Sequence, residues 1–260
     1  MTTTTAPPAE APSPLPRYPV AVSGRLDEHL SRWLWHVKWV LIIPHVIVLV
    51  FLWVGFVLMT IVAMVAILFT GRYPAALFRY NLGVLRWTWR VSYYAYGALG
   101  TDQYPPFSLQ EHPDYPATLD VDYPQQLSRG LALVKWWLLA IPHYLVVGAF
   151  LGGGAYAASH DERSGGAGLV GLLVLFAGVA LLFRGTYPRS LFDLVLGLDR
   201  WALRVAAYAG LMTDVYPPFR LDMGGLDPRS MMVTPAVPPA VPPAEPAPPA
   251  EPAPPGSPAP

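Results

Sequence analysis

The chain contains no cysteine among its 260 residues. This absence excludes disulfide bonds, thiolate catalysis and cysteine-based zinc or iron–sulfur sites. Net charge is also absent, since 17 Lys and Arg side chains balance 17 Asp and Glu side chains. Without a basic excess there is no bulk electrostatic attraction to nucleic acid, so we expect no nucleic-acid partner.

Charged side chains are scarce throughout. They make up 13% of the chain, against 53% apolar residues, which is about half the charged fraction of a typical globular protein. Residues 39–71 contain no Asp, Glu, Lys or Arg, whereas a membrane span needs roughly 20 such uncharged residues. Residues 1–16 have neither a basic residue nor an apolar core, so they do not form a secretory signal peptide. The composition predicts an integral membrane protein.

The two ends have low complexity. Residues 1–17 are rich in Thr, Ala and Pro, and residues 234–260 consist almost entirely of Pro, Ala, Val and Glu. Such segments bury too little apolar surface to offset the entropy of ordering, so we expect disorder over 1–17 and 223–260. The tail is interpreted as a spacer, with docking onto an aromatic groove as the alternative.

Short segments of the first half recur in the second half in the same order. The recurring pairs are Tyr18-Pro19 with Tyr115-Pro116, Lys38 with Lys135, Ile43-Pro44-His45 with Ile141-Pro142-His143, Tyr73-Pro74 with Tyr187-Pro188, and Tyr104-Pro105-Pro106-Phe107 with Tyr216-Pro217-Pro218-Phe219. The separation grows from 98 residues at Ile-Pro-His to 114 at the Tyr-Pro pair that follows it, so the second copy holds an insertion of 16 residues there. The pattern predicts two similar membrane units, 18–109 and 115–222.

The insertion suggests how often each unit crosses the bilayer. In the second unit, polar residues 159–166 separate two apolar runs, which predicts a transmembrane hairpin with spans at about 132–157 and 167–184. The uncharged run of the first unit would extend roughly 50 Å as one helix, too long for a hydrocarbon core of about 30 Å. We therefore expect a second hairpin, with spans at about 33–54 and 56–70, a turn near Gly55, and Lys38 snorkelling to the interface.

Basic residues then lie on one side of the bilayer, and only Arg163 lies on the other. This bias predicts a multi-pass protein of the cell (inner) membrane with both termini in the cytoplasm. Because each unit crosses an even number of times, the two units are expected to run parallel about a pseudo-twofold axis along the membrane normal.

A further helix is expected in each unit, over residues 74–99 and 188–211. An arginine stripe containing Arg86 and Arg90 would be costly at bilayer depth, so the helices are predicted to be amphipathic and interfacial, with a third span as the alternative. Short alternating segments flank the helices and predict strands in a small cytoplasmic sheet. They are Val20–Ser23, Phe107–Leu109, Thr118–Asp122 and Phe219–Leu221. The predicted fold class is an all-α membrane protein with short flanking strands.

The segments LVKWWLLAIPHY and RGTYPRSLFDLVLGLDRWALRVAAYAGLMTDVYPPFRLD, with their counterparts in the first unit, resemble a bacterial membrane family. This family is the domain of unknown function 4389, and the resemblance extends from Tyr18 to Asp222 in two copies. It implies a membrane-spanning protein and no established activity. One departure is that Arg79 stands where the second unit has Asp193.

Six side chains of the further helices are candidates for binding anionic lipid headgroups, because arginine and tryptophan suit the cytoplasmic leaflet. They are Arg86, Arg90, Arg200, Arg204, Trp87 and Trp201. The alternative is ordinary anchoring by basic residues and an aromatic belt.

His45 and His143 are a candidate ligand pair for a metal or haem iron, since they occupy equivalent positions within apolar segments. The alternative is that each imidazole supports the backbone opened by the preceding proline. Asp102 and Asp214 could serve acid–base chemistry, although hydrogen bonds within a turn are the commoner role.

We expect no catalytic residue and no cofactor. The leading interpretation is a non-enzymatic membrane component that acts as a scaffold, binds a partner or organises lipids. Its expected partners are membrane lipids and an unidentified membrane or cytoplasmic protein. A small transporter or channel is the alternative, because repeated units often enclose a substrate path. A redox subunit that uses the two histidines is the second alternative.

Overall fold

The computed structural model describes residues 18–151 and 168–225 of the chain. The described part is mostly helical and contains a two-stranded sheet, which confirms the prediction of a mainly helical chain with short strands. The predicted disorder over 1–17 and most of the tail lies outside the described residues, as does the polar segment 159–166. Residues 223–225 of the expected tail are within the described part, where the Gly225 carbonyl accepts a hydrogen bond from the Gly24 amide at 2.9 Å.

The sheet joins strands β1 (Val20–Gly24) and β2 (Ala117–Val121) in antiparallel register. Val22 pairs with Leu119 at its centre, and these two residues are equivalent in the recurring sequence pattern. An antiparallel pair centred on equivalent residues implies an approximate twofold axis through that pair. Alternate side chains of both strands are buried, as expected for a sheet with one covered face.

Two of the four predicted strands are confirmed as β1 and β2, and the other two predictions are wrong. Neither Phe107–Leu109 nor Phe219–Leu221 forms a strand. In the first of these segments the Ser108 carbonyl accepts a hydrogen bond from the Arg90 guanidinium instead of a strand amide. The apolar alternation of these segments therefore reflects packing against helices.

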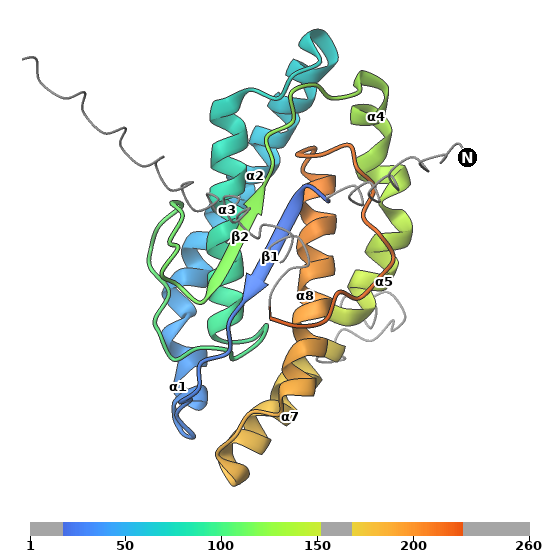
Figure 1. The fold of residues 1–260 in the computed structure, drawn as a ribbon. Coiled ribbons are helices and arrows are strands. Elements are labelled where there is room, and N and C mark those ends of the chain that lie inside the picture. Colours follow the sequence, from blue (N-terminus) through green and yellow to red (C-terminus); the bar gives the residue numbers. More distant parts are fainter. Residues whose placement is uncertain (1–17, 152–167, 226–260) are drawn as a thin grey trace, which may run out of the picture.

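Helices α3 (Ala75–Tyr94) and α8 (Arg189–Ala209) lie against the sheet, and Figure 1 shows the strand pair in front of them. Each helix follows a proline at its N-cap, where the missing N–H costs no hydrogen bond. Trp89 of α3 donates to the Ser23 carbonyl at 3.2 Å, and Arg200 of α8 donates to the Val22 carbonyl at 2.8 Å. These bonds fix both helices to β1.

The remaining helices form an outer layer on the side of α3 and α8 away from the sheet. In the first unit they are α1 (Leu34–Leu41) and α2 (Ile43–Thr70). In the second unit they are α4 (Arg129–Val134), the π-helix η1 (Lys135–Leu139), α5 (Ile141–Leu151) and α7 (Leu169–Arg184). The π-turn accommodates one extra residue, since Lys38 and Lys135 are 97 positions apart whereas His45 and His143 are 98 apart.

The predicted hairpin of the first unit is wrong, because α2 is continuous through Gly55. A Cβ atom at Gly55 would lie 2.2 Å from the Tyr80 hydroxyl, which donates to the Leu52 carbonyl at 3.1 Å. Gly55 therefore admits a tyrosine of α3 to the surface of α2 instead of turning the chain. The break in this segment occurs at Ile42, between α1 and α2.

In the second unit, α5 and α7 correspond to successive halves of α2. His143 of α5 is buried 98 positions after the buried His45. The buried residues Val170, Ala177 and Leu181 of α7 each lie 114 positions after a buried residue of α2. The turn of the predicted second hairpin falls within residues 152–167, outside the described residues.

In the described part of the chain, α2 is the one helix long and apolar enough to cross a bilayer unaided. The segment from Arg129 to Leu151 also meets that standard if its two pieces, which are bent by 43°, count as one span. Most of the α2 surface is exposed. Length and composition of these one or two segments thus favour a membrane location.

Candidate functional site

Each unit holds a buried histidine in an aromatic clamp. Trp87 Nε1 donates to His45 Nδ1 at 3.1 Å, and the His45 ring stacks on Phe107 with centroids 3.8 Å apart. In the second unit Trp201 Nε1 donates to His143 Nδ1 at 3.1 Å, and a matching stack uses Phe219 at 4.2 Å. Because Nδ1 accepts in both cases, each neutral ring carries its proton on Nε2.

The predicted ligand pair is not brought together by these contacts. His45 and His143 share no ring neighbour among the described aromatic contacts, and one nitrogen of each ring is already occupied. No group of three or more His, Cys, Asp or Glu residues in the described ranges could hold a metal ion. The clamps instead fasten the Tyr-Pro-Pro-Phe segments to α2 and α5.

A buried ion pair also occurs in each unit. Lys38 Nζ lies 2.7 Å from Asp102 Oδ1 and donates to the Thr101 carbonyl at 2.6 Å. Lys135 Nζ lies 2.8 Å from Asp214 and donates to the Thr213 carbonyl at 2.8 Å. The prediction that Lys38 snorkels is wrong, since its side chain is only 2% exposed.

The two aspartates also bind the chain elsewhere. Asp102 Oδ2 accepts from the Ser31 amide and Asp214 Oδ2 from the Ser128 amide, each at 2.6 Å. These partners are distant in sequence, so the aspartates do not act within a single turn. Sequence reasoning missed these pairs, although the recurrence of a lysine and of a Thr-Asp step in both units was a usable signal.

The candidate arginines are bonded to the chain itself. Arg86 Nε donates to the Leu119 carbonyl of β2 at 2.9 Å, and Arg200 Nε donates to the Val22 carbonyl of β1 at 2.8 Å. Each of these equivalent arginines thus binds the strand that belongs to the other unit. Arg204 forms an ion pair with Asp222 at 2.5 Å.

Burial limits the contact of these side chains with lipid. Arg90, Arg200, Arg204, Trp87 and Trp201 are all buried. Arg86 is the partly exposed member of the set, and its guanidinium pairs with Glu111 at 3.1 Å and Asp120 at 2.9 Å. Headgroup binding by these six side chains stays a prediction, whereas their structural contacts are directly visible.

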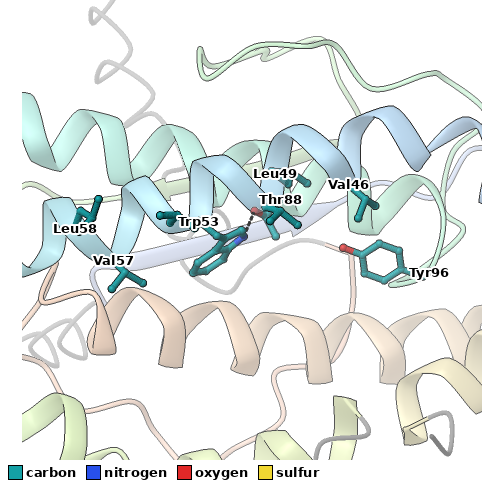
Figure 2. A pocket seen from close by; sticks show the side chains of 9 residues that line it. Val46, Leu49, Trp53, Val57, Leu58, Thr88 and Tyr96 are labelled. Atoms are coloured by element: carbon teal, nitrogen blue, oxygen red, sulfur yellow. Dashed lines mark hydrogen bonds between the residues drawn. The ribbon is translucent and has the colours of Figure 1, made fainter.

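A wide apolar groove runs along α2 and was not predicted from the sequence. One hollow of about 640 Å³ is lined by Val46, Leu49, Val50, Trp53, Val54, Val57, Leu58, Thr88 and Tyr96. Figure 2 shows Trp53 between α2 and the neighbouring helices, with its indole donating to the Thr88 hydroxyl at 3.1 Å. This bond satisfies the polar edge of the ring and leaves its apolar surface facing the groove.

A second hollow of about 420 Å³ meets the first at Trp53 and Val57, which line both. It lies between the two units and is lined otherwise by Phe56, Thr60, Ile61, Met64, Trp136, Tyr144, Ala206, Ala209, Gly210 and Leu211. The surface offers almost no polar group to a ligand. An apolar chain is therefore the ligand chemistry that the groove fits.

One carboxyl group lies buried without a counter-charge among the described residues, whereas each buried lysine has one. Asp199 of α8 is 5% exposed, and its Oδ2 has no hydrogen-bond partner among the described residues. Burial raises the pKa of Asp199 well above its ordinary value. Leu85 occupies the equivalent position, 114 residues earlier, so the acid belongs to the second unit alone.

We expect Asp199→Leu to remove part of the pH dependence of folding. A raised pKa in the folded state means that stability is fully present below the unfolded pKa of about 4 and falls as pH rises towards the folded pKa. The contribution is about 1.4 kcal/mol per pH unit for one proton. Denaturant unfolding in detergent between pH 4 and pH 8 should show a flatter profile for Asp199→Leu and Asp199→Asn. Identical slopes in all three proteins would contradict an uncharged Asp199.

Comparison with known proteins gives a family without an assigned activity. No curated protein and no solved structure matches the chain. A family described as a domain of unknown function (DUF4389) matches residues 25–108 and 166–220, two segments consistent with two copies of the domain. These segments contain α1, α2, α3, α7 and α8, and with them Arg86 and Arg200, whereas both strands lie outside the matched residues. With more than half of its length matched, the chain belongs to the DUF4389 family.

Proposed function

We propose that this protein is a non-enzymatic membrane component that organises lipids by holding an acyl chain in the groove along α2. The apolar lining of the groove carries the proposal. An acyl chain forms no hydrogen bonds, and the groove has almost no polar groups that would need a hydrogen-bond partner. The ligand would bind through van der Waals contact of its methylene groups with this lining, since an acyl chain that comes from the surrounding lipid is already out of water.

The surroundings of the groove support a lipid over a water-soluble ligand. Large apolar side chains of α2 outside the groove are exposed, among them Ile47, Phe51 and Phe69. Soluble proteins rarely expose so extended an apolar surface, and where one occurs it marks a contact with a membrane or another protein. A bilayer would cover it and supply acyl chains directly to the groove.

The proposed chemistry needs no catalytic group. The buried histidines, lysines and arginines are held by Trp, Asp and backbone partners, so their geometry serves the fold. In the proposed role, the assembled units also serve as a scaffold on which a membrane or cytoplasmic protein docks.

Val57→Trp is expected to block the groove, because Val57 lines both hollows. The protein would be reconstituted into liposomes of phosphatidylethanolamine and phosphatidylglycerol that contain a spin-labelled phospholipid. Electron spin resonance counts the lipids whose chains are immobilised by protein. We expect Val57→Trp to lose about one immobilised chain per protein, on the assumption that the groove of a few hundred Å³ holds one chain.

Ile47→Trp is the matched control, since Ile47 is exposed on the same helix but lines neither hollow. Its immobilised-lipid count should equal that of the unmodified chain. Equal counts for all three proteins would refute acyl-chain binding in the groove, provided that circular dichroism shows the same helix content.

A further inference from the structure

We infer that α2 and its counterpart α5–α7 lie in the plane of one leaflet, with the sheet facing the aqueous phase, instead of crossing the bilayer. This inference rests on the membrane association in the proposed function and adds the orientation of the chain. Its basis is where the charged groups lie relative to α2.

Basic residues lie at both ends of α2. Arg32 precedes the helix and Arg72 follows it, and 28 residues of helix separate the ends by about 42 Å. Arginines of the second unit join them, because the Arg129 side chain lies beside Gly71 and the Arg32 side chain lies beside Gly185. A crossing α2 would place these clusters on opposite sides of the membrane, against the positive-inside rule. An in-plane α2 keeps both clusters at the same depth.

Exposed carboxylates lie level with the middle of α2. Hydrogen bonds from Tyr80 to the Leu52 carbonyl and from Trp53 to Thr88 align the middle of α3 with the middle of α2. Arg86 lies within that part of α3 and forms its ion pairs there.

The carboxylates that pair with Arg86 are not shielded by the described residues. The Glu111 and Asp120 side chains are 58% and 51% exposed. If α2 crossed the bilayer, these carboxylates would face hydrocarbon near its centre, where charged side chains are costly. With α2 in the plane, they face water on the sheet side of the molecule.

The arrangement of the layers fits this orientation. Strands β1 and β2 lie on one side of α3 and α8, and α2 lies on the other. The approximate twofold axis through the strand pair then runs along the membrane normal. Both outer helical segments present exposed apolar side chains, which include Ile47, Phe51, Val54, Leu58, Ile61, Phe69, Leu172, Phe176, Val179 and Phe183.

Depth measurements can separate the two orientations, and the natural absence of cysteine makes site-directed spin labelling direct. Single cysteines would replace Ile47, Val54, Ile61 and Phe69, all of which are exposed on α2. Oxygen and a water-soluble nickel chelate would report the depth of each nitroxide in liposomes of phosphatidylethanolamine and phosphatidylglycerol. We expect four similar depths within one leaflet. A crossing helix would spread the labels over roughly 15 Å of depth, with the deepest near Val54 and Ile61.

Labelling from the aqueous phase gives a second readout. Glu28→Cys and Arg72→Cys place exposed cysteines towards the two ends of α2, and Asp120→Cys marks the sheet side. A membrane-impermeant maleimide should modify all three from the same side in inside-out vesicles and none in intact cells. Modification of Glu28→Cys and Arg72→Cys from opposite sides, or a depth profile with a central maximum, would overturn the in-plane orientation.

Flotation of the liposomes on a density gradient distinguishes this inference from the proposed function. A protein that fails to float would refute both. A protein that floats and loses immobilised lipid on Val57→Trp, but shows the crossing depth profile, would refute the in-plane orientation alone. A protein that floats in the in-plane orientation with an unchanged lipid count would refute only the groove.

Discussion

Arg200→Met is expected to lower the free energy of unfolding by about 4 kcal/mol, because three carbonyl groups, one buried and two partly buried, lose a charged donor. Arg200 donates to the carbonyls of Val22, Asp222 and Gly224. Methionine fills a similar volume but donates nothing, so these acceptors are left without that donor. Denaturant unfolding in detergent, followed by tryptophan fluorescence, would measure the loss.

Arg86→Met is the matched control for this substitution. Arg86 makes the equivalent bond to the Leu119 carbonyl, but its remaining partners are two exposed carboxylates. Ion pairs at the surface contribute little because water screens them, so the expected loss is about 1–2 kcal/mol. Equal losses of unfolding free energy for the two substitutions would show that the greater burial of Arg200 adds nothing to its contribution to stability.

Asp214→Ala is expected to cost about 3–5 kcal/mol, because it leaves a buried ammonium group without its counter-charge. The Lys135 side chain is fully buried and lies 2.8 Å from Asp214. Removal of the carboxylate also removes the acceptor of the hydrogen bond that the Ser128 amide donates. Thermal unfolding followed by circular dichroism would show the loss as a lower melting temperature.

The double variant Lys135→Met with Asp214→Ala tests the cause of that loss. Without the ammonium group no buried charge remains, so the double variant should recover a large part of the stability lost by the single one. The Lys38 and Asp102 pair offers the same cycle in the first unit. A double variant no more stable than Asp214→Ala would show that the pair contributes through packing alone.

Sequence patterns predicted local structure well where short-range chemistry decides it. The proline before α3 and α8 and the alternation in β1 and β2 depend on neighbouring residues. Family membership was also accessible, since the recurring Tyr-Pro and Ile-Pro-His segments carry it.

Patterns could not give the arrangement of the helices in space. The length of the apolar run favoured a hairpin at Gly55, whereas the close approach of Tyr80 explains that glycine. A glycine that admits a side chain and a glycine that turns the chain look alike in a sequence. Likewise, the partners of Arg200 and Lys135 lie 178 and 79 residues away, beyond the reach of periodicity.

The groove could not be predicted from the sequence for a related reason. Its walls come from α2, η1, α5 and the end of α8, so its shape depends on how two units pack. Tryptophan, valine and methionine at helical spacing are equally compatible with a filled core and with an open groove. The apolar side chains that line the groove are visible in the sequence, whereas the space between them is not.

The crosswise bonds of Arg86 and Arg200 make the duplicated chain indivisible. A chain that held one copy would leave its own strand edge open and its arginine without the carbonyl that the other copy provides. A relative with a single copy would have to form a homodimer about the same twofold axis. Gene duplication with fusion would then have turned an assembly that depends on protein concentration into one that does not.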